Sequence, residues 1–335
     1  MSHAFATGNS DPLLRRRQRL SAAFSLCCRG CTWGALLVLA VLLGSIGWNA
    51  IGWLDWQFLT SPHSADPKKA GLFVGIWGSL WMIVFTMIFC VPLGVGTAIY
   101  LEEYAPNNWL TRIIKLNLAN LAGVPSIVYG MLGLAVFARM FGMFTRDGGE
   151  PTVFRILGFF DVHLPFGRSV LTGSLTMALL ILPVVVIATQ EALKSVPASI
   201  RTASFALGAS RWQTIRFQVL PASIPGITTG VILALSRAIG ETAPLIMIGS
   251  MLTVFYTPGN IESPLDIVTS PGKLADVPFS NFTAMPIQIF NWVAQAKPDF
   301  YYAAAAGIVT LLVILLAFNA LAVWIRHRAS KKVQW

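Results

Sequence analysis

The run FQVLPASIPGITTGVILALSRAIGETAPL, residues 217–245, decides the fold, because a long apolar segment ends in two opposite charges. Residues 217–236 contain no charged side chain, and a transmembrane helix needs about 20 apolar residues. Arg237 and Glu241 lie four residues apart, so a continuous helix places both on one face within pairing distance. Charges inside a membrane span are costly and usually face protein or a water-filled path. The stretch therefore predicts a membrane helix with an ion pair at a functional position.

Five further runs without charge set the number of spans. Hydrophobic residues make up 55% of the chain and charged residues only 11%. A closed barrel would instead show short strands of alternating polarity. We therefore predict an all-α integral membrane protein with six transmembrane helices. The other five runs are residues 30–54, 70–101, 116–138, 169–190 and 300–325.

The positive charge is distributed as in a membrane protein. The net charge is +10, which alone could indicate nucleic-acid binding. Most Lys and Arg residues, however, lie in the two tails and in the loops after spans two and four, the alternation expected of cytoplasmic segments. We expect both termini in the cytoplasm, and no nucleic-acid partner. The expected divisions are a basic extension (1–30), a six-span domain (31–325) and a basic tail (326–335).

The third span carries polar and helix-breaking residues that could line a transport path. Pro125 lacks a backbone donor and is expected to kink the helix, and broken polar spans often line such paths. A packing kink at a helix contact explains the same pattern equally well. The candidate lining residues are Asn120, Pro125, Ser126 and Tyr129. On the outer side, residues 285–293 predict a short amphipathic helix on the membrane surface.

The loop after the fourth span, residues 191–224, predicts an ordered projection. We expect one short helix near 197–207 and a second near 210–219. Gly208 between them suits a helix end in the left-handed conformation.

Capping residues and prolines set the expected ends of these two helices. Ser199 and Ser210 are the candidate N-caps, because a serine side chain can accept from the first free backbone donors. Pro221 and Pro225 are expected to break the chain before the fifth span.

This projection resembles the coupling motif of bacterial ABC-transporter membrane subunits, which reads Glu-Ala-Ala, then Gly, then Ile-x-Leu-Pro. Thr202, Ser204 and Gln218 depart from the motif, where the family has Glu, Ala and Ile. In that family the projection docks on a separate ATPase subunit. The resemblance implies an ATPase contact through Thr202, Ala203, Gly208, Ala209, Leu220 and Pro221.

Three further segments resemble the phosphate-uptake ABC permeases, the PstA type more than the PstC type. They are GVGTAIYLEEYAP (94–106), NLAGVPSIVYGMLGL (120–134) and LSRAIGETAPL (235–245), and the likeness covers residues 72–324. It implies a type I importer fold and a translocation path lined by the arginine-bearing helix. It also implies four kinds of partner: a PstC-like permease, a PstB-like ATPase dimer, a PstS-like phosphate-binding protein and inorganic phosphate.

The Arg237–Glu241 pair suits a site that binds an oxyanion weakly and releases it again. Arg237 offers a planar fork that can donate two hydrogen bonds to phosphate. Glu241 can neutralise the guanidinium when no anion is present. A static ion pair that holds the span in the bundle is the alternative.

Other functions remain open at this point. A permease for sulfate or molybdate, a gradient-driven anion transporter and a membrane sensor or scaffold are the competing interpretations. The chain has no phosphate-binding loop of the Gly-x-x-x-x-Gly-Lys-Ser/Thr type. We therefore expect no catalytic residue and no cofactor in this chain, with ATP and Mg used by the partner ATPase.

Three cysteines near the first span could suggest a metal site. Cys27, Cys28 and Cys31 lack a fourth ligand, which a structural zinc site requires. We expect no metal here, and read them as small apolar residues at a helix end.

Overall fold

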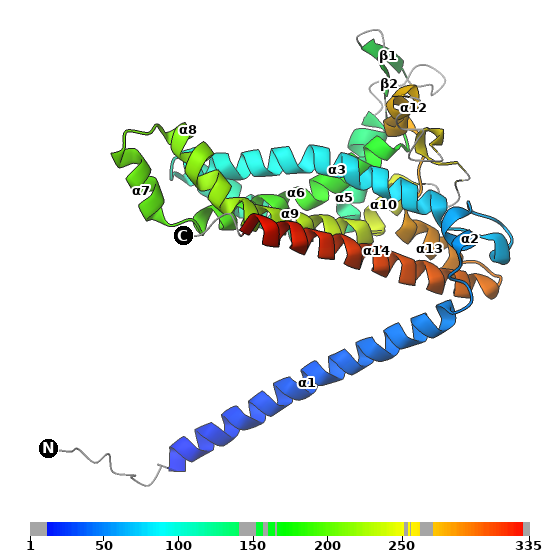
Figure 1. Cartoon of the computed structure of the whole chain (residues 1–335), viewed down its shortest axis with the longest axis horizontal. Coiled ribbons are helices and arrows are strands. Elements are labelled where there is room, and N and C mark those ends of the chain that lie inside the picture. Colours follow the sequence, from blue (N-terminus) through cyan, green and yellow to red (C-terminus); the bar gives the residue numbers. More distant parts are fainter. Residues whose placement is uncertain are drawn as a thin grey trace.

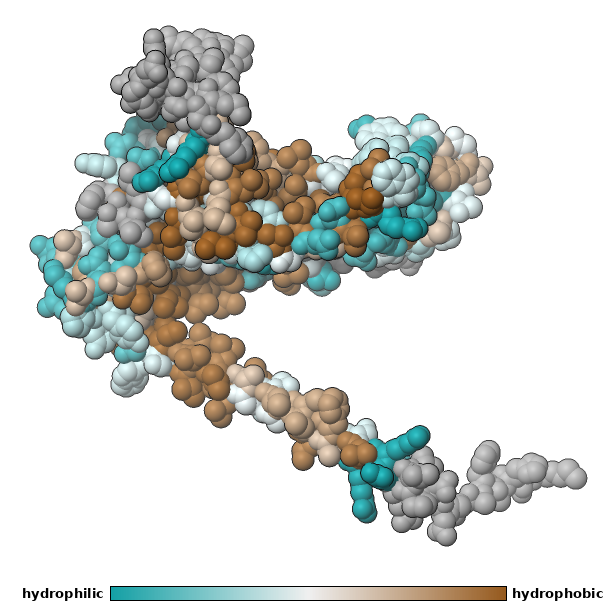
Figure 2. Space-filling view, turned by 180° about the vertical axis from the view of Figure 1, so that it is seen from behind, coloured by the Kyte–Doolittle hydropathy of each residue, from teal (hydrophilic) through white to brown (hydrophobic). Residues whose placement is uncertain are grey.

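The computed structural model describes residues 12–140, 152–156, 160–164, 166–250, 254, 256–261 and 271–330. Long helices lie side by side in a body, and α1 leaves that body as a separate rod (Figure 1). Hydrophobic residues cover the length of the helices, and hydrophilic residues gather at the ends (Figure 2). The helices are α1 (Pro12–Ala50), α2 (Trp56–Thr60), α3 (Phe73–Ile99), α4 (Trp109–Leu121), α5 (Ser126–Gly133), α6 (Val170–Lys194), α7 (Ala198–Ala206), α8 (Arg211–Thr214), α9 (Leu220–Gly240), α10 (Ala243–Ile248), α12 (Pro271–Asp276), α13 (Met285–Val293) and α14 (Asp299–Ser330).

Single π turns, single 3-10 turns and one hairpin complete the described elements. A hairpin of β1 (Thr152–Ile156) and β2 (Phe160–Leu164) pairs Thr152 with Leu164, a small exception to the expected all-helical chain. Its residues include β-branched and aromatic types, which favour strands. The π turns are η2 (Tyr100–Tyr104), η3 (Leu134–Ala138) and η5 (Ile215–Val219), and the 3-10 turns are η1 (Pro67–Lys69), η6 (Pro258–Asn260) and η7 (Val277–Phe279).

The helical membrane fold is confirmed. Among the described residues, five helical segments are long and apolar enough to cross a bilayer. A sixth is obtained when α4 and α5 with η3 are taken together, although they meet at a bend of 102°. The third span is therefore broken in two rather than merely kinked.

The break lies at residues 122–125 and has a clear cause. Pro125 occupies the N-cap position of α5 with extended ψ, and proline can neither donate to the preceding turn nor fit against it. The Tyr129 hydroxyl donates to the Leu121 carbonyl at 2.8 Å. The same carbonyl accepts from the Val124 N–H at 3.1 Å, and the bond from Tyr129 ties the two halves together.

Helix α6 lies at the centre of the core, packed between α3 and α9. Close approach to α9 depends on small residues at a spacing of four. A Cβ on Gly230 would lie 2.4 Å from the Ala188 Cβ, and one on Gly226 would lie 2.8 Å from the Ala192 Cβ. Such small-residue contacts let membrane helices pack closely.

Helix α13 buries one face in the body and leaves Phe290 and Val293 exposed, so its position on the membrane surface stays a prediction. Trp292 is fully buried and packs in a cluster with Phe58 and Phe300. The polar side chain of Gln288 is also buried, and its Nε2 donates to the Gly71 carbonyl at 2.7 Å. This bond satisfies the Nε2 of the amide where α13 packs between α3 and α14.

Helix α1 is continuous across residue 30, where the sequence suggested a boundary. Only its end joins the core, through Ala50 and the partly buried Ile46. After Ala50 the chain turns at Gly52, whose φ of +90° is accessible to glycine. The rest of α1 projects away from the body (Figure 1).

Candidate functional site

The Arg237–Glu241 pair forms at the end of α9. Arg237 Nε donates to Glu241 Oε1 at 3.3 Å, as the spacing predicts. The helix is not continuous, however: it ends at Gly240, and Glu241 has extended backbone angles before α10 begins. Pro244 contributes to the break, because it has no N–H to donate to the Gly240 carbonyl.

The guanidinium of Arg237 remains accessible. Its side chain is 53% exposed, whereas that of Glu241 is 21% exposed. The neighbouring Ser236 hydroxyl donates to the Asn319 side chain and links α9 to α14, and Leu235 is buried in the core. Neighbouring contacts therefore fix the end of α9, and the Arg237 guanidinium there keeps donors beyond its hydrogen bond to Glu241.

The four residues expected to line a path fall into two groups. Asn120 and Pro125 are exposed and Ser126 is half-buried at the α4–α5 break. Tyr129 is buried and holds the break together, in the same apolar cluster as Ala238 of α9.

Close packing also joins α5 to α10. A Cβ on Gly130 would lie 2.6 Å from the Pro244 Cα. The broken third span thus packs against the segment that follows Glu241.

At one end of the body, α7 and α8 form the expected projection (Figure 1). Gly208 between them has φ +83°, the left-handed conformation that its position predicts. Ser210 caps α8 in a reciprocal pair with Gln213, so this cap is confirmed. Ser199 is not a cap, because Pro197 occupies the N-cap position of α7.

The two prolines do not break the chain. Pro221 lies in the first turn of α9 and Pro225 lies inside it. The π turn Ile215–Val219 immediately precedes Pro221 and joins α8 to α9 without interruption. A wide turn moves the preceding carbonyls away from the proline ring, so the second helix of the projection runs directly into a membrane span.

One departure from the coupling motif has a structural use. The Ser204 hydroxyl lies 2.9 Å from that of Thr214, and the two brace α7 against α8. Thr202, Ala203, Gly208 and Pro221 are exposed, while Ala209 and Leu220 are half-buried. Large apolar side chains are also exposed on the projection, namely Phe205, Leu207 and Trp212.

Two further residues at this end were missed by sequence reasoning. Glu103 is buried and accepts from Arg201 Nη2 at 2.7 Å. The two are 98 positions apart, so no local pattern connects them.

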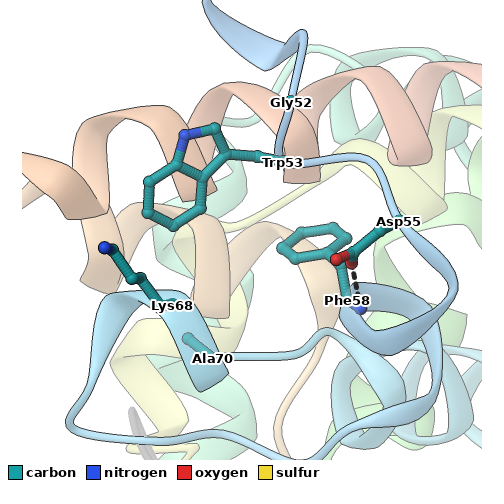
Figure 3. A pocket seen from close by; sticks show the side chains of 6 residues that line it. All are labelled: Gly52, Trp53, Asp55, Phe58, Lys68 and Ala70. Carbon is teal, nitrogen blue, oxygen red and sulfur yellow. Dashed lines mark hydrogen bonds between the residues drawn. The ribbon is translucent and has the colours of Figure 1, made fainter.

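A pocket of about 280 Å³ lies at the opposite end, where α1 turns into α2 (Figure 3). The Asp55 carboxylate in it already accepts from the Phe58 backbone N–H at 2.8 Å. Lys68 is the cation of this pocket, and Trp53 stacks on Tyr302 of α14. The pocket does not include Arg237.

Known proteins resemble this chain over most of its length. Residues 90–331 match the family model described as "Binding-protein-dependent transport system inner membrane component". The probable ABC transporter permease protein YqgI of Bacillus subtilis (strain 168) is 32% identical over 308 residues, 89% of this chain and 93% of the relative.

Phosphate transport proteins of both types are also similar. The phosphate transport system permease protein PstC of Mesorhizobium japonicum is 30% identical, covering 93% of this chain and 91% of its own. PstA 1 of Mycobacterium tuberculosis (strain CDC 1551 / Oshkosh) is 28% identical, covering 89% and 86%.

A solved structure shares the fold. A chain of a bacterial ABC transporter involved in the import of the acidic polysaccharide alginate aligns with a TM-score of 0.55 at 15% identity, over 94% of this chain and 99% of that one. The helical architecture, the projection and the sequence match agree, and the chain belongs to the family of binding-protein-dependent transport system inner membrane components, the membrane subunits of ABC importers.

Proposed function

We propose that this chain is a PstA-type permease subunit of an ATP-driven importer of inorganic phosphate. It pairs with a PstC-like permease, and the pair binds a PstB-like ATPase dimer and a PstS-like phosphate-binding protein. Both termini lie in the cytoplasm. The chain itself performs no covalent chemistry, because ATP and Mg are used by the ATPase subunits.

The observation that carries the substrate proposal is the half-exposed Arg237 at the broken end of α9. Its side chain is 53% exposed and makes one hydrogen bond of 3.3 Å to Glu241. A second acceptor can therefore approach the fork, and phosphate matches its geometry. Glu241 competes for the same cation, so a bound anion is released rather than trapped.

The α4–α5 break supports a path beside this pair. Asn120 and Ser126 place polar side chains on either side of the non-helical residues 122–125. Unwound backbone in membrane proteins occurs where it lines a cavity or is buried by protein. The Tyr129 hydroxyl stabilises this bend through its hydrogen bond to the Leu121 carbonyl.

The projection is the proposed ATPase contact. Phe205, Leu207 and Trp212 expose apolar surface there, which in a soluble region marks a protein interface. Thr202, Ala203, Gly208, Ala209, Leu220 and Pro221 then shape the docking surface and its link to α9.

A PstC-type role is the second candidate, favoured by the PstC relative at 30% identity over 329 residues. Coexpression with an authentic PstA subunit or an authentic PstC subunit separates the two. A PstA-type chain assembles a working importer only with PstC.

Phosphate uptake in proteoliposomes tests the function. The complete complex is expected to accumulate phosphate when ATP and loaded binding protein are supplied, and excess sulfate or molybdate should not compete. Uptake of sulfate or molybdate in place of phosphate would identify a different oxyanion importer.

Arg237→Gln tests the site. Loss of a charge-assisted contact costs about 1.5–3 kcal/mol, so uptake should fall at least about tenfold. Arg112→Gln, on the exposed face of α4, is the matched control. Glu241→Gln removes the competitor and should slow phosphate release. Normal uptake by Arg237→Gln would refute the pathway role, and failure to assemble would favour a static ion pair.

A further inference from the structure

The end of α3 carries two neighbouring carboxylates that bond to two different helices. Glu102 Oε2 accepts from Lys115 Nζ of α4 at 3.1 Å. Glu103 Oε1 accepts from Arg201 Nη2 of α7 at 2.7 Å. Both acids lie in the π turn Tyr100–Tyr104. This turn therefore contacts the broken third span and the proposed ATPase contact at the same time.

The bond to α7 is the more protected of the two. The side chains of Arg201 and Glu103 are 22% and 10% exposed, compared with 38% and 20% for Lys115 and Glu102. Water and salt weaken exposed pairs strongly and buried pairs much less. The Glu103–Arg201 bond is thus the durable connection.

Arg201 makes two further bonds from the same guanidinium. Its Nη1 donates to the Val196 carbonyl at 2.7 Å, and its Nη2 also donates to the Leu193 carbonyl at 3.0 Å. Leu193 belongs to the last turn of α6, where carbonyls lack helical partners. One side chain on α7 therefore holds the ends of both α3 and α6.

Little else fixes α7 to the body. Among the described residues, α7 has no buried side chain, and Ile200 is its partly buried contact with the cluster around Leu193. The Ser204–Thr214 contact joins α7 to α8, and through it only indirectly to the span α9. Without Arg201, α7 can tilt while α3 and α6 stay in place.

We infer that the Glu103–Arg201 pair transmits displacement of α7 to α3 and α6, and so couples ATP hydrolysis to transport. This inference rests on the proposed function in one respect, namely that α7 and α8 receive the motion of an ATPase. Glu103 and Arg201 are positioning residues: they touch neither substrate nor nucleotide. Their loss leaves ATP hydrolysis running while the spans no longer follow it.

The test measures phosphate uptake per ATP hydrolysed by the complete complex in proteoliposomes. Arg201→Gln and Glu103→Gln should keep ATPase copurification and hydrolysis, and should lower this ratio at least about fivefold, the lower range of energetic coupling between sites. Arg201→Lys keeps the charge without the fork and should be intermediate. Glu191→Gln is the control, because the Lys194–Glu191 pair is similarly short but exposed.

A second readout does not depend on the substrate. Spin labels at Thr97 of α3 and Ser199 of α7, in a background without the four free cysteines, report the α3–α7 distance. With ATP and Mg, the distance should stay narrow in the wild-type complex and broaden in Arg201→Gln. An unchanged ratio, or an unchanged distance distribution, would overturn the inference. Loss of ATPase binding together with uptake would also overturn it, since the pair would then only stabilise the fold. A wild-type complex that moves no phosphate would refute the proposed substrate, while the distance measurement still decides the coupling role.

Discussion

Gly208 offers the sharpest test of the projection, because its substitution separates backbone conformation from crowding. Its φ is +83°, and an added Cβ would meet no atom within 4 Å. Gly208→Ala therefore introduces no clash, and its whole cost comes from placing an L-residue in the left-handed region. That cost is about 1–2 kcal/mol.

This energy converts directly into binding. A penalty of that size lowers the ratio of the observed turn to its alternatives by a factor of about 5–30. If the ATPase recognises only this turn, its apparent dissociation constant rises by up to the same factor. Asn tolerates the left-handed region, so Gly208→Asn should bind nearly as the wild type does.

The assay is binding of the purified ATPase to the purified permease complex, with thermal unfolding of the complex as control. Because α7 buries no side chain among the described residues, the melting temperature should not change. Wild-type affinity in Gly208→Ala would show that the ATPase does not depend on this turn. Equal weakening by Asn and Ala would show that any side chain at this position interferes with binding, and the conformational reasoning would be wrong.

Three further changes test the packing of the body. Gly130→Ala places a Cβ 2.6 Å from the Pro244 Cα, a backbone atom that cannot rotate away. It should destabilise the complex by about 1–3 kcal/mol. Gly96→Ala has open space around it and should leave the melting temperature unchanged. Asn319→Leu removes the hydrogen bond between α9 and α14 and should cost about 0.5–2 kcal/mol, read as a lower melting temperature; an unchanged value would show that the bond contributes nothing. Burial lowers the pKa of His63 from its usual 6.5, so the contribution of this residue to stability is complete above pH 6.5 and is lost as the pH falls through the lowered pKa. The melting temperature should therefore drop between pH 7.5 and 5.5. A pH dependence that persists in His63→Phe would assign the effect to other groups.

Features determined by neighbouring residues were predictable from the sequence. The lengths of the charge-free runs gave the spans. The left-handed turn at Gly208 and the cap at Ser210 each depend on a few adjacent atoms, and the pairing of Arg237 with Glu241 needs only their spacing.

Features determined by tertiary contacts were not. The π turn before Pro221 keeps the chain helical where proline alone predicts a break. The buried Gln288 of α13 finds its partner in the Gly71 carbonyl, far earlier in the chain. The bond between Glu103 and Arg201 exists only because α3 and α7 meet. Periodicity and local motifs carry no information on such partners.

The 39 residues of α1 give a rod about 58 Å long, nearly twice the roughly 30 Å of hydrocarbon in a bilayer. It is fastened to the body only near Ala50, just before the turn at Gly52. Each 10° of rotation about the turn at Gly52 therefore moves the far end of α1 by about 10 Å. Lipid and adjoining subunits, rather than the described part of the body, therefore determine the orientation of α1.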